Sequence, residues 1–197
     1  SVFGNGGNAR NIAFVVDASG SMVGVLPFVI NELKRVINGL KDSQKFTIIF
    51  FTGEGVFEVP GGGRRQGLRA ATAEFKQQAS SWITLDSHNV EPHGRGSINA
   101  VAAIEQALSH RPQLVFLLSD NLTGGGQGAT KDEIFQADVM DAIEESNDYN
   151  PPAKINTIQF LYVDPLINAG LTGTLERIAE ETGGNYKFLD ERELNLR

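Results

Sequence analysis

The chain has 197 residues, of which 41% are hydrophobic and 21% are charged, and this balance is typical of a folded domain with a real core. Its net charge of -7 argues against nucleic acid or an anionic membrane surface as the main partner. Because the chain has no cysteine, disulfides and thiolate metal sites are excluded. No apolar run approaches the ~20 residues that cross a bilayer.

Short apolar segments alternate with helical patterns along nearly the whole chain. The segments that we expect to form strands are 11–16, 46–52, 56–59, 113–118, 155–163 and 185–189. Apolar residues at helical spacing predict helices over 24–38, 68–83, 97–109, 131–146 and 171–182. The tight turn at 52–55 predicts a hairpin between the second and third strands.

This order of elements predicts the fold class. Alternating strands and helices favour an open, doubly wound, mostly parallel α/β sheet with helices on both faces, and the hairpin adds one antiparallel edge strand. No internal repeat or linker is visible in the sequence. We therefore predict a single domain over 1–197, with its core at about 11–189.

Two of the predicted strands end in a carboxylate. The apolar run of "FVVDASGSM" at 14–22 stops at Asp17, with Ser19 and Ser21 at alternate positions, and the strand at 113–118 is followed by Asp120. Sites in an open parallel sheet form at the carboxyl ends of the strands. If these two strands are neighbours, the carboxylates repel each other unless they are protonated or bridged by a cation. An all-oxygen cluster of this kind suits a hard divalent cation such as Mg²⁺, Mn²⁺ or Ca²⁺.

A simpler interpretation of the first loop is a helix N-cap, but a cap accounts for one of these residues and not for three at alternate spacing. The loop before the third helix carries His88, Glu91 and His93. Their spacing matches no strong zinc pattern, so contact with a partner is favoured there over a second metal site. Asp164 precedes a proline, which favours the start of a turn over a further acid near the site.

The stretch "DASGS" at 17–21 fits the D-x-S-x-S pattern of the von Willebrand factor A domain, which is also found as the inserted domain of integrins. In that family the pattern forms the metal-ion-dependent adhesion site, and the fold is an open α/β sheet with one antiparallel edge strand. The resemblance covers about 11–189 and looks bacterial in style. It implies that Asp17, Ser19 and Ser21 are the ligands from the first loop.

Two further ligands are implied by the same resemblance. In "RGSINAVAAIEQAL" at 95–108, Ser97 stands where the family usually has threonine, and it keeps the hydroxyl. In "LLSDN" at 117–121, Asp120 fits the third loop, with Asn121 in place of the usual glycine. The expected cofactor is a divalent cation, Mg²⁺ first, with Mn²⁺ or Ca²⁺ as alternatives.

The resemblance implies a binding and adhesion module and not an enzyme, with no catalytic residue. An exposed Asp or Glu of a partner protein would complete the coordination of the ion. Two alternatives stay open: a metal-dependent phosphoester hydrolase with His88 or His93 as base, and an assembly domain that captures no ligand. Against the hydrolase, Ser19 stands where haloacid-dehalogenase phosphatases need a second Asp.

The sequence begins with Ser1, and we expect it to be part of a larger protein or complex. This expectation and the family resemblance favour an extracytoplasmic or cell-surface location, without deciding the compartment. No membrane insertion by this segment and no nucleic-acid binding are expected.

Overall fold

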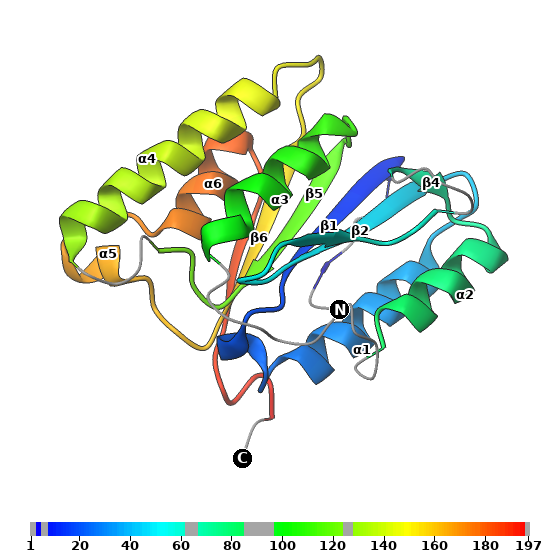
Figure 1. The fold of residues 1–197 in the computed structure, drawn as a ribbon, viewed down its shortest axis with the longest axis horizontal. Helices are drawn as coiled ribbons and strands as arrows, with labels where there is room; N and C mark the ends of the chain where they lie inside the picture. The colour runs from blue at the N-terminus through cyan, green and yellow to red at the C-terminus, as the bar shows by residue number, and fades with distance from the viewer. Residues whose placement is uncertain (1–2, 5–7, 62–66, 85–96, 124–127, 196–197) are drawn as a thin grey trace.

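The computed structural model describes residues 3–4, 8–61, 67–84, 97–123 and 128–195, with the backbone alone at 97 and 98. These residues form a seven-stranded sheet in the order β3-β2-β1-β5-β6-β7, with β4 also paired to β2 (Figure 1). The strands are β1 (Asn11–Asp17), β2 (Lys45–Phe51), β3 (Val56–Glu58), β4 (Arg69–Ala70), β5 (Leu114–Ser119), β6 (Lys154–Phe160) and β7 (Tyr186–Leu189). All pairs are parallel except β3 and β4, which run antiparallel to β2.

Helices cover both faces of this sheet. The α-helices are α1 (Leu26–Gly39), α2 (Ala73–Trp82), α3 (Ser97–Ser109), α4 (Ala129–Ser146), α5 (Pro165–Asn168) and α6 (Thr174–Thr182), and a 3₁₀ turn, η1 (Gly20–Met22), precedes α1. Figure 1 shows α1 and α2 on one face and α3, α4 and α6 on the other. No helix among the described residues combines the length and the apolar character needed to cross a bilayer.

The continuous apolar runs of the central strands follow from this layering. In β1, Phe14 and Val16 join the core under α1 and α2, whereas Ala13 and Val15 join the core under α3, α4 and α6. Successive side chains of a strand point to opposite faces, so a strand covered on both faces is apolar at nearly every position. This architecture confirms the predicted fold class and the predicted hairpin between β2 and β3.

Two predicted elements are wrong in extent. The helix expected over 68–83 starts at Ala73, because Arg69 and Ala70 pair with β2 and the Thr72 hydroxyl caps the helix by accepting from the Phe75 N–H at 3.2 Å. The strand expected over 155–163 ends at Phe160, and α5 follows at 165–168 where no helix was predicted.

Candidate metal centre

The carboxyl ends of β1 and β5 lie side by side. The two strands pair in parallel, with Val16 opposite Leu118, so Asp17 and Ser119 follow at the same level of the sheet. Asp120 comes directly after the end of β5. The sheet order therefore brings the two predicted strand-end carboxylates to one edge.

Asp17 is only 1% exposed, and both of its carboxylate oxygens accept hydrogen bonds. The Ser19 N–H donates to Oδ1 at 2.8 Å, and the Ser119 hydroxyl donates to Oδ2 at 2.7 Å. The oxygen of Ser119 in turn accepts from the Asn121 N–H at 3.1 Å. The loops after β1 and β5 are thus tied together through this one carboxylate.

Hydroxyl groups connect Asp17 to Asp120. The Oγ atoms of Ser19 and Ser21 are 3.2 Å apart, and the Ser21 side chain is hydrogen-bonded to the Asp120 carboxylate. Ser19 and Asp120 are each 3% exposed, whereas Ser21 faces solvent. The Gln159 amide donates to the Asp120 backbone oxygen at 3.3 Å, which helps to hold the third loop against β6.

Burial disfavours the charged form of both acids. Burial raises the pKa of Asp17 to about 6, and the negative charge of Asp120 adds to this, although the hydrogen bonds from Ser19 and Ser119 act in the opposite direction. Burial also raises the pKa of Asp120, against the hydrogen bond from Ser21. A bound cation would favour the charged form of both acids.

These residues fit a hard divalent cation. Every side-chain donor in the cluster is an oxygen, two of the donors are carboxylates, and no nitrogen or sulfur takes part. The adjacent Asn121 has a buried Oδ1 that accepts no hydrogen bond from the described residues. The cluster contains only two acidic side chains, and the described ranges hold no group of three or more His, Asp or Glu side chains that is placed to hold a metal.

Four of the five predicted ligands, Asp17, Ser19, Ser21 and Asp120, therefore lie together. The fifth, Ser97, is the first residue of α3, and its side chain lies outside the described part of the chain. The loop residues His88, Glu91 and His93 also lie outside it.

Asp164 is confirmed as the start of a turn. Its Oδ1 accepts from the Leu166 N–H at 2.9 Å, and its Oδ2 accepts from the Thr174 N–H at 2.8 Å. Because both oxygens are engaged in capping α5 and in fixing the start of α6, this carboxylate holds a loop together.

The supporting role of Ser119 and the buried acid Glu58 were both missed from the sequence. Glu58 is 5% exposed and accepts hydrogen bonds from Thr47 at 2.7 Å, from Gln106 at 2.7 Å and from the His110 ring at 2.9 Å. Burial alone would raise the pKa of Glu58, but the bonds from His110, Gln106 and Thr47 outweigh it and lower that pKa. Only the strand register would have indicated Ser119, and no local signal marks Glu58.

Comparison with known proteins agrees with this fold. The family model for the von Willebrand factor type A domain matches residues 10–188. No curated protein sequence matches the chain. Among solved structures, a von Willebrand factor type A protein from Catenulispora acidiphila is similar, with a TM-score of 0.69 and 19% identity over 94% of this chain.

Two pilus proteins share the fold. The pilus adhesin SpaC from Lactobacillus rhamnosus GG has a TM-score of 0.56 and 15% identity over 94% of this chain. The PilB minor pilin from Streptococcus sanguinis has a TM-score of 0.64 and 14% identity over 93% of it. This chain spans 40% of the Catenulispora protein, 29% of SpaC and 58% of PilB. Because the family model covers nearly the whole chain, the protein belongs to the von Willebrand factor type A domain family.

Proposed function

We propose that this domain is a divalent-metal-dependent protein-binding module. Asp17, Ser19, Ser21, Ser97 and Asp120 would hold the ion, with Mg²⁺ as the first candidate and Mn²⁺ or Ca²⁺ as alternatives. The observation that carries the proposal is the pair of buried acids with raised pKa values at one sheet edge, linked through two serine hydroxyls. An acidic side chain of a partner protein would complete the coordination.

The donor set explains why such a site would favour a carboxylate from outside. An octahedral Mg²⁺ takes about six ligands, so five side chains leave a position for water or for a partner. The hydroxyls add ligands without adding charge, and only two carboxylates offset the charge of the ion. When bound, the ion supplies a localised positive charge that attracts an incoming Asp or Glu. The chain itself fixes the Asp17 carboxylate through the backbone N–H of Ser19 and the hydroxyl of Ser119.

Two structural neighbours support a role in binding. They are the pilus adhesin and the minor pilin described above, and the name of the first indicates adhesion. We propose from this that the domain acts in recognition and not in catalysis. A metal-dependent hydrolase and an assembly domain without ligand capture are the competing functions that the experiments below separate.

Calorimetric titration of Mg²⁺, Mn²⁺ and Ca²⁺ into metal-stripped protein tests the ligand assignment. We expect saturable binding at one site in the wild type and its loss in Asp120→Ala. Asp42→Ala is the matched control, because it removes an exposed acid outside the cluster. If Asp120→Ala stays folded by circular dichroism and binds Mg²⁺ as tightly as the wild type, the assignment is wrong.

The protein-binding role needs a separate test. Loading the protein with Mn²⁺ and adding glutarate should lower the water proton relaxation rate, because a carboxylate displaces a water molecule from the ion. Wild type that binds metal but shows no change with glutarate would favour the assembly function. Metal-dependent turnover of a panel of phosphoesters would favour the hydrolase.

A further inference from the structure

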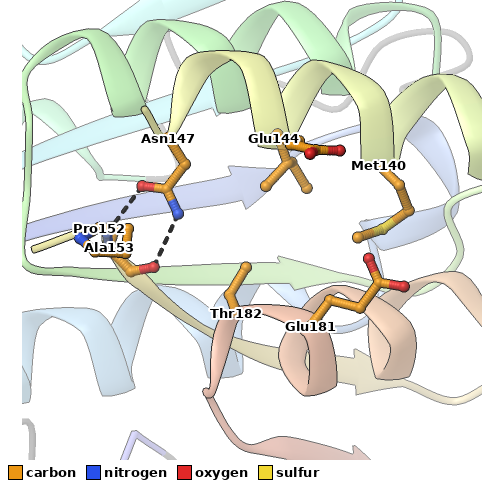
Figure 2. A pocket seen from close by; sticks show the side chains of 8 residues that line it. Met140, Glu144, Asn147, Pro152, Ala153, Glu181 and Thr182 are labelled. Carbon is orange, nitrogen blue, oxygen red and sulfur yellow. Dashed lines mark hydrogen bonds between the residues drawn. The ribbon is translucent and has the colours of Figure 1, made fainter. Parts of the chain in front are cut away.

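A second candidate binding surface lies between α4 and α6, away from the metal centre. The two helices and the chain leading into β6 form the walls of a cavity of about 490 Å³, which we call the groove (Figure 2). Met140, Ile143 and Ala153 line it with buried apolar side chains. Glu144 from α4 and Glu181 from α6 also line it, and both are exposed. The cavity therefore combines an apolar floor with one carboxylate from each helix.

Hydrogen bonds hold the walls of this groove in place. The Asn147 side chain accepts from the Ala153 N–H at 2.8 Å and donates to the Ala153 carbonyl at 3.0 Å, as the dashed lines of Figure 2 show. The Thr182 hydroxyl accepts from the Ile155 N–H at 3.0 Å and donates to the Ile178 carbonyl at 2.8 Å. The groove is thus already formed in the free domain, as binding sites usually are.

The two helices that flank the groove carry the excess negative charge of the molecule. Along its length, α4 has six acidic residues and one lysine, and α6 has three acidic residues and one arginine. Their combined net charge is -7, which equals the net charge of the whole chain, so the remaining residues sum to zero.

The two groove carboxylates differ in their partners. Glu144 has no ion pair with any described residue, and Glu181 pairs through Oε1 with Arg177 Nε at 2.8 Å. Both partners in that pair are exposed, so the pair contributes little and can rearrange when a competing cation arrives.

We propose that this groove docks a basic segment of a partner protein and receives one Arg or Lys side chain. The methylene stem of that side chain would lie on Met140 and Pro152, and its charged head would lie between the carboxylates of Glu144 and Glu181. Long basic side chains bury their stems in this way while their charges stay near solvent. The charge of α4 and α6 selects a cationic partner and would repel nucleic acid, an anionic membrane and the same face of a second copy.

The groove is separate from the metal centre. Its walls meet at Asn147 and Ala153, next to the start of β6, whereas Asp120 follows the end of the neighbouring strand β5. The paired strands are roughly 20 Å long at their ordinary rise per residue. The two surfaces therefore lie at opposite ends of the strands, and this inference does not depend on the metal centre.

Fluorescence anisotropy of a fluorescein-labelled peptide with three arginines separated by glycines tests the proposal. The titration uses the whole chain, with EDTA and at low salt, and a peptide with citrulline in place of arginine is the charge control. The test variant is Glu144→Gln with Glu181→Gln. The matched control variant is Glu133→Gln with Asp138→Asn, which removes the same charge from exposed positions of α4 outside the cavity.

We expect the groove variant to bind the arginine peptide about fivefold more weakly or worse, because an exposed ion pair contributes up to roughly that factor. The control variant should lose less than about twofold, and the citrulline peptide should not bind. Amide shifts in ¹⁵N-labelled protein should lie at residues 140–147 and 181–182. Equal losses in the two variants, shifts confined to other residues, or no binding of the arginine peptide would each overturn the proposal. Full displacement of the peptide by Ca²⁺ would also overturn the proposal, because it would indicate a site for a metal cation instead.

Discussion

Replacing Asp17 by asparagine should stabilise the metal-free protein at neutral pH. The folded pKa of Asp17 is raised from 3.8 to about 6, so the folded state holds this proton more tightly than the unfolded chain does. The contribution of Asp17 to the stability of the wild type is therefore greatest below pH 3.8. It falls as the pH rises through about 6 and stays constant above that. A difference of about two pKa units amounts to about 3 kcal/mol.

This difference already includes the hydrogen bonds from Ser19 and Ser119, which lower the pKa against the effect of burial. Asparagine is neutral, like the protonated acid, and its side-chain oxygen can still accept from the Ser19 N–H. We therefore expect a gain of up to about 3 kcal/mol at about pH 7.5. The gain should shrink by about 2 kcal/mol at about pH 4.5, where much of the unfavourable charge has been neutralised.

Urea unfolding followed by circular dichroism in EDTA measures this difference at several pH values. The control is Asp42→Asn, which changes an exposed carboxyl and should give a difference from the wild type that does not vary with pH. Saturating Mg²⁺ should raise the melting temperature of the wild type and leave that of Asp17→Asn unchanged. Parallel stability curves for Asp17→Asn and the wild type between about pH 4.5 and about pH 7.5 would refute the reasoning.

Three further substitutions test the packing and the buried hydrogen bonds of the fold by differential scanning calorimetry and urea unfolding. A Cβ at Gly184 would lie 1.9 Å from the Ile155 carbonyl oxygen, so Gly184→Ala should lower the stability by at least about 2 kcal/mol. A Cβ at Gly39 would have no neighbour within 4 Å, so Gly39→Ala should raise the stability by up to about 1 kcal/mol. Equal effects of the two alanines would contradict the close approach at Gly184. Glu58→Gln should lower the stability by about 1–3 kcal/mol at neutral pH, because it removes the negative charge of a carboxylate that accepts three hydrogen bonds. Because the pKa of Glu58 is lowered, the stability difference between the wild type and Glu58→Gln should be complete above about pH 4.5 and shrink as the pH falls below it. A stability difference that does not change with pH would count against the hydrogen-bond network.

Local sequence patterns predicted most of the sheet. The uninterrupted apolar runs that became β1 and β5 marked strands covered on both faces, and the tight turn after β2 marked the hairpin. The same patterns placed Asp17 and Asp120 at strand ends. Periodicity failed at 69–70, where pairing with β2 prevailed over a helical pattern, because long-range strand pairing is invisible to a local window.

The sequence by itself thus determined which segments form strands and helices and which strands end in carboxylates. Only the tertiary structure decided that β1 and β5 are neighbours, and this adjacency lets Ser119 donate to Asp17 from 102 residues away. The same holds for the groove between α4 and α6, whose charge is visible in the sequence but whose cavity is not. The physical reason is that strand order and helix packing depend on contacts between distant segments, whereas periodicity and residue type report only on the local chain.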